Sequence, residues 1–354
     1  MRCDMKVNLD RQTDKQAELK NCNFVKTVLM LLVVFYHSIL FWKGNWFTAN
    51  PVTEVELLSV LAGWLNSFHI YAFTLVSGYL FYYLKYECGK YQRFWPFVGN
   101  KFKRLMVPYI FVALVWVIPI QWWFFRFDGV TAIKNFALAL NPNQLWFLIM
   151  LFDVFVIVWL LSNFFAKHHF LGAITALVLY GVGLVGMVAF SNVFMVCRAL
   201  TYVPFFWLGF KLRQGGMVYV KRIPAWIWLV ADLALFALRK YVIDSNASLL
   251  FKLLSVGLDF LLHMVGAITA FVVLQKLADC VNGDHPFWKY FGKRSMVIYL
   301  FHQQVIYFFI FFLNGVVNPY VNALINFVGS VAISLLICGV LMKFKWTKYL
   351  IGEK

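Results

Sequence analysis

The sequence predicts an all-α integral membrane protein, a polytopic bundle of about ten transmembrane helices with both termini in the cytoplasm. Composition gives the first two observations: 62% of the 354 residues are hydrophobic and only 13% are charged, whereas a soluble domain averages about 45–50% apolar and about 25% charged residues. The third is that the apolar residues form long runs. Together they exclude a soluble enzyme, a disordered chain and a fibrous repeat.

The apolar runs have the length that membrane-crossing helices require. A helix needs about 20 apolar residues to cross the roughly 30 Å hydrocarbon core of a bilayer. A transmembrane β-barrel would instead alternate apolar and polar residues in segments of about ten residues. The ten predicted spans are Phe24 to Trp42, Leu57 to Leu84, Leu105 to Phe125, Leu145 to Phe165, Phe170 to Phe190, Ala199 to Phe210, Ala225 to Leu238, Leu249 to Leu274, Met296 to Leu313 and Ala323 to Met342.

The distribution of Lys and Arg supports this number of spans and sets their orientation. With the N-terminus inside, cytoplasmic segments hold 24 of the 32 basic residues and outer loops hold five, as short cytoplasmic loops of membrane proteins do. We therefore predict a cytoplasmic segment at residues 1–23, a membrane domain at 24–345 and a cytoplasmic tail at 346–354. Topology also explains the net charge of +17, so we expect no nucleic-acid partner.

Ionisable side chains within spans are candidates for function, because they are costly in lipid and usually face the bundle interior or a water-filled cavity. Lys26 and His37 are eleven residues apart, which places them on one helix face about 16 Å apart along the axis. A cation near the cytoplasmic surface and a deeper imidazole suit a site that holds an anion and transfers a proton. Alternatively, His37 is a structural imidazole bonded to a neighbouring carbonyl, and Lys26 only reaches toward the surface.

Two further groups of polar residues are open to two interpretations. Asp259 and His263 are four residues apart, so the carboxylate could orient the ring, or the pair could join two helices. Lys101, Lys103 and Arg104 could hold the phosphates of a nucleotide-like cofactor at the membrane surface. They could equally be cytoplasmic charges in contact with anionic lipid. The six cysteines have no metal-ligand spacing, so we predict no metal site.

Five motifs in order resemble the acyltransferase family 3 membrane proteins, which include O-acetylases of bacterial glycans and fucose 4-O-acetylase-like proteins. The resemblance covers about residues 20 to 345. The motifs are Val33–Ser38 (VVFYHS), Phe73–Leu80 (FTLVSGYL), Lys101–Tyr109 (KFKRLMVPY), Leu145–Leu148 (LWFL) and Gly292–His302 (GKRSMVIYLFH).

The resemblance implies transfer of an acyl group, typically acetyl from cytoplasmic acetyl-CoA, to a hydroxyl of a carbohydrate or glycolipid at the inner (plasma) membrane. The family pairs an arginine with a histidine in the first span, and here His37 matches while Lys26 replaces the arginine. The family's paired arginines map to Lys101 and Arg104. Lysine keeps the charge but loses the planar fork of arginine.

The predicted mechanism places the CoA phosphates at Arg104, Lys101 and Lys103, and the thioester near His37, which acts as general base or acyl carrier. His302, near the cytoplasmic end of its span, lines the thioester path or only packs. Two other classes remain open: a transporter or flippase of a glycolipid, and a non-catalytic membrane partner. The transporter would explain the 20% aromatic content, but the sequence has no inverted repeat to support it.

Overall fold

The computed structural model describes residues 2–44, 46–242 and 249–353, with side chains described from residue 19 onward except at 241, 242, 249 and 250. Most side chains of the predicted segment 1–23 therefore lie outside the described residues. Within the described residues all regular structure is helical, which confirms the all-α class. Nine of these helices are long and apolar enough to cross a membrane: Leu19–Lys43, Glu56–Glu87, Phe94–Phe125, Asn143–Lys167, His169–Ala189, Val193–Lys221, Phe251–Cys280, Pro286–Leu313 and Pro319–Leu341.

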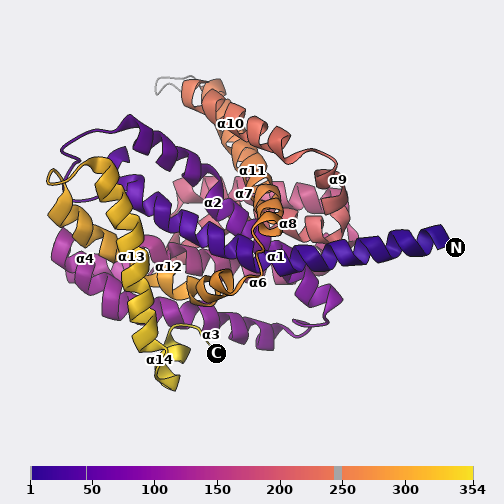
Figure 1. The fold of residues 1–354 in the computed structure, drawn as a ribbon, viewed down its shortest axis with the longest axis horizontal. Coiled ribbons are helices and arrows are strands. Elements are labelled where there is room, and N and C mark those ends of the chain that lie inside the picture. The colour runs from indigo at the N-terminus through magenta and orange to yellow at the C-terminus, as the bar shows by residue number, and fades with distance from the viewer. Residues whose placement is uncertain (1, 45, 243–248, 354) are drawn as a thin grey trace.

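The helices form one bundle, from which the N-terminal part of α1 projects and in which the short last helix lies beside α3 (Figure 1). In chain order the α-helices are α1 (Arg2–Leu40), α2 (Glu56–Tyr82), α3 (Phe94–Val112), α4 (Ile118–Phe125), α5 (Gly129–Ala132), α6 (Trp146–Lys167), α7 (His169–Ala189), α8 (Val196–Lys211), α9 (Met217–Lys221), α10 (Ala225–Val242), α11 (Leu249–Cys280), α12 (Pro286–Leu313), α13 (Pro319–Leu341) and α14 (Lys345–Leu350).

The remaining predicted span is α10, a helix with three charged residues among its 18 positions. Because of these charges, α10 is not one of the nine helices named above. The chain that leads into α10 and α10 itself nevertheless run from one end of α2 to the other. Arg213, before α10, pairs with Glu87 just after α2, and Lys240 in the last turn of α10 pairs with Glu56 at the start of α2. Since α2 crosses the bundle, the chain between Arg213 and Lys240, which ends in α10, crosses it too.

The two ends of the membrane domain lie at the same face of the bundle. Asn23 in α1 and Glu353 after α14 line one cavity, as an even number of crossings requires. That this face is the cytoplasmic one remains a prediction from the charge distribution.

Two helices begin about ten residues earlier than predicted. α3 starts at Phe94 rather than Leu105, and α12 starts at Pro286 rather than Met296. In both added segments aromatic residues alternate with basic ones, so the helix continues although the hydropathy is too low to mark a span. The segment Lys101–Arg104, predicted as the end of a loop, is therefore helical.

Helices α2 and α8 touch through their backbones. A Cβ atom on Gly78 would lie 1.9 Å from the carbonyl oxygen of Phe206, and one on Gly209 would lie 1.8 Å from that of Leu75. Membrane helices commonly approach this closely through small residues.

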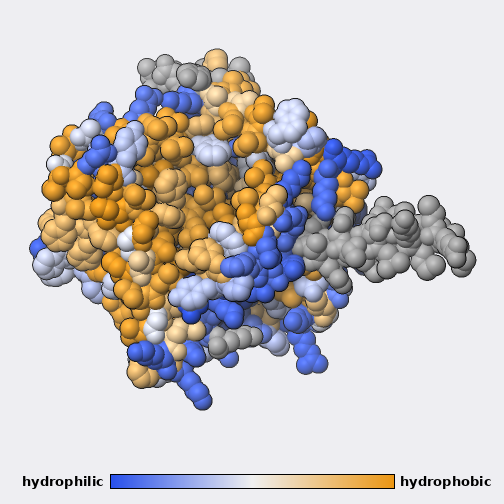
Figure 2. All heavy atoms as spheres, viewed as in Figure 1, coloured by the Kyte–Doolittle hydropathy of each residue, from blue (hydrophilic) through white to orange (hydrophobic). Residues whose placement is uncertain are grey.

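On the outside of the bundle, apolar residues cover most of the visible surface, and hydrophilic residues gather where α1 leaves it (Figure 2).

Candidate active site

A cavity of about 580 Å³ opens at the face where the two ends of the membrane domain meet. Residues of α1, α2, α3, α6 and α12 form its wall, together with two residues that follow α14. Its inner part is lined by apolar and aromatic side chains. The charged side chains that line it are Lys26, Lys101, Arg104, Asp284, Lys289, Lys293 and Glu353.

Cations outnumber carboxylates at this cavity. Asp284 accepts ion pairs from Lys289 at 3.0 Å and Lys20 at 3.4 Å, and these lysines hold the pKa of its carboxyl below the usual value. Among the described residues, Lys26 and Arg104 have no hydrogen-bond or ion-pair partner. Unpaired cations in a partly enclosed cavity favour an anionic ligand.

The three basic residues predicted on the α3 segment have different environments. Arg104 lines the cavity and is free to bind. Lys101 also lines it, but its ammonium lies 3.5 Å from the centre of the Phe155 ring and 5.2 Å from that of Tyr91, a cation–π arrangement that fixes it in place. Lys103 is exposed and does not line the cavity, so the structure does not bring it to this site.

Lys289 and Lys293 also line the cavity, although the sequence alone does not mark them as binding residues. They are four residues apart on the early turns of α12, so they share one helix face, and both line the cavity. From the sequence both are predicted only as cytoplasmic charges, although Lys293 also belongs to the motif Gly292–His302. Their spacing on an amphipathic extension of the helix was the signal that could have identified them.

The cavity ends one helical turn below a pair of histidines. Val33 and Tyr299 line its inner end, and the next turns of the same two helices carry His37 and His302. The two rings face each other, with His302 Nε2 3.1 Å from His37 Nδ1 and 5.0 Å between ring centres. His302 is fully buried, whereas His37 keeps partial exposure.

Backbone carbonyls determine where the protons of this pair lie. His302 Nδ1 lies 2.8 Å from the carbonyl oxygen of Tyr299 and 3.1 Å from that of Ile298, so it carries the proton, and His302 Nε2 is an acceptor. His37 Nδ1 faces that acceptor and the carbonyl oxygen of Val33 at 2.9 Å. His37 therefore carries its proton on Nδ1 and leaves Nε2 as the basic atom.

The position predicted for His302 is wrong. It was expected near the cytoplasmic end of its span, but α12 begins at Pro286, so His302 lies in the middle of the helix, level with His37. The contact between His37 and the carbonyl oxygen of Val33 agrees with the structural interpretation of this imidazole. That bond does not exclude catalysis, because it uses Nδ1 and not Nε2.

The comparison with known proteins assigns the chain to a family. A model of the acyltransferase domain matches residues 19–343. The chain belongs to this acyltransferase family. The match confirms the resemblance drawn from the motifs, and with the membrane-length helices it makes the protein a multi-pass membrane acyltransferase. No curated protein and no solved structure matches the chain.

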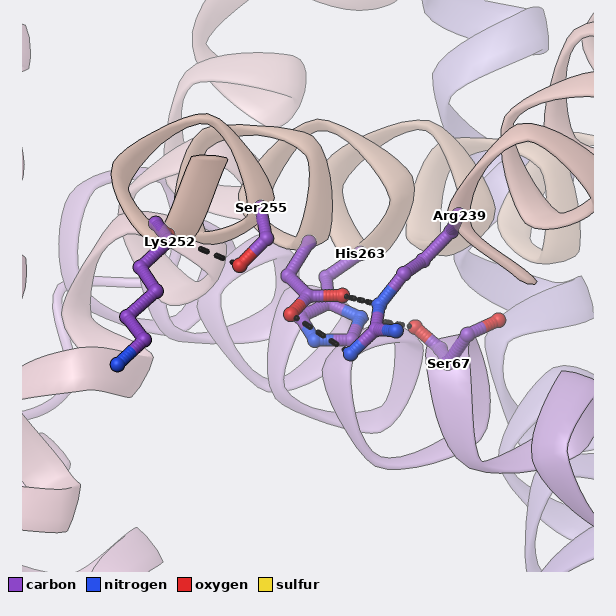
Figure 3. Close-up of polar contacts among 6 residues, drawn as sticks. Ser67, Arg239, Lys252, Ser255 and His263 are labelled. Carbon is purple, nitrogen blue, oxygen red and sulfur yellow. Dashed lines mark hydrogen bonds and ion pairs between the residues drawn. The ribbon is translucent and has the colours of Figure 1, made fainter. Parts of the chain in front are cut away.

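In this acyltransferase, Asp259 and His263 do not pair with each other. Asp259 accepts two hydrogen bonds from Arg239 of α10, the shorter at 2.5 Å, and His263 Nδ1 lies 2.7 Å from the carbonyl oxygen of Ser67 on α2 (Figure 3). Neither residue lines the cavity. They join α11 to α10 and α2, as the interpretation that these residues connect helices predicted. They do not form part of the candidate active site.

Aromatic and amide side chains of the acyltransferase lie beyond the histidines, on the side away from the cations. The Trp46 ring is 6.0 Å from His37 and 5.0 Å from Tyr307. Gln303 donates to the Tyr307 hydroxyl at 2.6 Å and also bonds Asn143. Among the described residues of the acyltransferase, no group of three His, Cys, Asp or Glu side chains is arranged to hold a metal ion.

Proposed function

We propose that this acyltransferase transfers an acetyl group from acetyl-CoA to a hydroxyl of a carbohydrate or glycolipid, and that it acts in the inner (plasma) membrane. One observation carries the proposal: a cation-lined cavity leads from one face of the bundle to within a helical turn of the His37–His302 pair.

The donor binds with its anionic end at the mouth of the cavity. Arg104 of α3 and Lys289 and Lys293 of α12 face the CoA phosphates, together with Lys26 of α1. Arginine binds phosphate through two parallel hydrogen bonds. The uncharged pantetheine arm extends along the apolar inner wall, which ends at Val33 and Tyr299 below the histidines.

His37 Nε2 performs the proton chemistry. A hydroxyl ionises far above neutral pH, so its oxygen needs a base as it attacks the thioester carbon. As the new C–O bond forms and the C–S bond breaks, Nε2 takes the hydroxyl proton and returns it to the CoA thiolate. In the covalent variant Nε2 first attacks the thioester carbon and the C–S bond breaks to release the CoA thiolate. The acceptor oxygen then forms the C–O bond as the C–N bond to Nε2 breaks, and the hydroxyl proton goes to the thiolate. Both routes use the same atom.

The test is His37→Ala, assayed in membranes with labelled acetyl-CoA. We expect transfer to be abolished, while acetyl-CoA still raises the unfolding temperature, since a ligand at 100 times its Kd stabilises by about 2.7 kcal/mol. The exposed His168→Ala is the control and should retain activity. Full transfer by His37→Ala would remove His37 from the mechanism. A transporter or a non-catalytic partner would release no thiol from acetyl-CoA.

The acceptor can be identified in cells. Mass spectrometry of surface glycans, with and without the protein, should show the loss of acetyl groups from one glycan class. An unchanged acetyl content in every glycan class would contradict a carbohydrate acceptor.

A further inference from the structure

The segment after α14 forms part of the wall of the cation-lined cavity. Gly352 and Glu353 both line it. The segment is held firmly, because Ile351 is 0% exposed and belongs to the same apolar cluster as Leu105 and Tyr109 of α3.

A helix cap sets the position of Glu353. The amide of Gly352 donates to the carbonyl oxygen of Tyr349 at 3.1 Å, and the amide of Glu353 donates to that of Lys348 at 2.9 Å. This is the Schellman arrangement, which places a glycine with positive φ just after the helix. Gly352 has φ +75°, and a Cβ atom on it would lie 2.7 Å from the carbonyl oxygen of Arg104. The glycine thus lets the chain press against α3 at the residue that carries the free guanidinium.

Glu353 lies in a cavity lined by cations, but none of the described residues forms an ion pair with it. Of the two acidic residues that line the cavity, Asp284 is already neutralised by Lys20 and Lys289. Glu353 forms no ion pair with any described residue. Burial raises the pKa of its carboxyl, and attraction to Arg104 opposes that rise only in part.

We propose that Glu353 is a specificity-determining residue of the donor site: its carboxylate competes with the phosphates of the donor for Arg104 and lowers the affinity for anionic ligands. The inference rests on the proposed function for the identity of the donor. It implies that the empty site is partly neutralised by its own chain, and that only a ligand with several negative charges binds well. A carboxylate near a bound phosphate repels it, and the repulsion weakens with added salt.

The experiment measures binding of CoA, and separately of acetyl-pantetheine, which lacks the nucleotide phosphates, to the full-length protein and to Glu353→Gln. We expect the Kd for CoA to fall about 3- to 10-fold in the variant at low salt. The difference should shrink at high salt, and the Kd for acetyl-pantetheine should not change. Glu54→Gln, an exposed carboxylate in the segment between α1 and α2, is the control and should bind CoA as the unmodified protein does.

An unchanged or higher Kd for CoA in Glu353→Gln would overturn the inference, as would an equal change for acetyl-pantetheine. Glu353→Lys is a second variant at the same position, so the test does not depend on Glu353→Gln alone. It should bind CoA more tightly than Glu353→Gln does. A protein that binds CoA with the expected Glu353 effect but transfers no acetyl group would refute the proposed function alone. A protein that transfers acetyl groups without that effect would refute this inference alone.

Discussion

At the scale of single residues, the positions of the protons in the histidine pair determine which nitrogen atom of His37 acts as the base. His37 Nδ1 is committed to the Val33 carbonyl oxygen and to His302 Nε2. When Nε2 takes a proton, both acceptors remain in place and stabilise the imidazolium. His302 is thus a positioning residue, which acts on the reaction through His37.

Replacing His302 by Phe should slow acetyl transfer without weakening donor binding. The variant loses the hydrogen bond that His302 Nε2 accepts from the protonated His37. A hydrogen bond to a charged group contributes about 1.5–3 kcal/mol, so kcat should fall roughly 10- to 100-fold. His302→Gln, whose amide oxygen can accept the same hydrogen bond, should recover part of the rate. Steady-state kinetics would show whether kcat changes while the KM for acetyl-CoA stays constant. A His302→Phe enzyme with normal kcat would contradict this role.

The sequence identified some residues of the candidate site but not their grouping. Lys26 and Arg104 are recognisable because a charge in or beside a span is rare, and the structure places both at the cavity. The partnership of His37 with His302 joins residues 265 positions apart, and no local pattern encodes such a contact. Asp259 has a partner on another helix, Arg239, which the spacing to His263 could not reveal.

At the scale of helices, hydropathy finds the membrane-crossing segments well and their ends poorly. The apolar runs depend on burial in lipid, so nine of them appear as helices of the predicted type. The first turns of α3 and α12 lie where basic and aromatic residues alternate, and there helix formation depends on tertiary contacts rather than on lipid. The added turns of α12 carry Lys289 and Lys293, so the error in this helix end hid the part of the donor site that α12 provides.

The contact between α2 and α8 should tolerate no added side chain. Gly78→Ala places a methyl group against the backbone of Phe206, so we expect a loss of stability at the upper end of about 1–3 kcal/mol. Gly99→Ala in α3 is the matched control, because nothing lies within 4 Å of its Cβ position. That variant should be neutral or more stable by about 0.5–1 kcal/mol. Thermal unfolding in detergent compares them, and equal unfolding temperatures would contradict the close contact.

At the scale of the whole molecule, the arrangement of ten crossings makes a specific prediction about sidedness. Single cysteines replacing Lys20 and Trp346 should react with an impermeant thiol reagent from the cytoplasmic face. Cysteines replacing Glu54 and Val316 should react from the opposite face, since the segments around them are joined by hydrogen bonds of Asn314. The background protein must lack its own cysteines, because Cys88 and Cys280 are exposed. Labelling of positions 20 and 346 from different faces would contradict an even number of crossings.

The glycine contact also limits how the donor can reach the histidines. With carbonyl oxygens of each helix against the glycine of the other, α2 and α8 cannot slide or rotate past one another without separating, so they behave as a single rigid body. α2 forms part of the cavity wall and no residue of α8 lines the cavity, so this body supplies a rigid part of the wall through α2. Any widening that admits a bulky thioester must therefore come from movement of the other parts of the wall, which are α1, α3, α6, α12 and the chain after α14. Of these, α1, α3 and α12 carry the phosphate-facing cations.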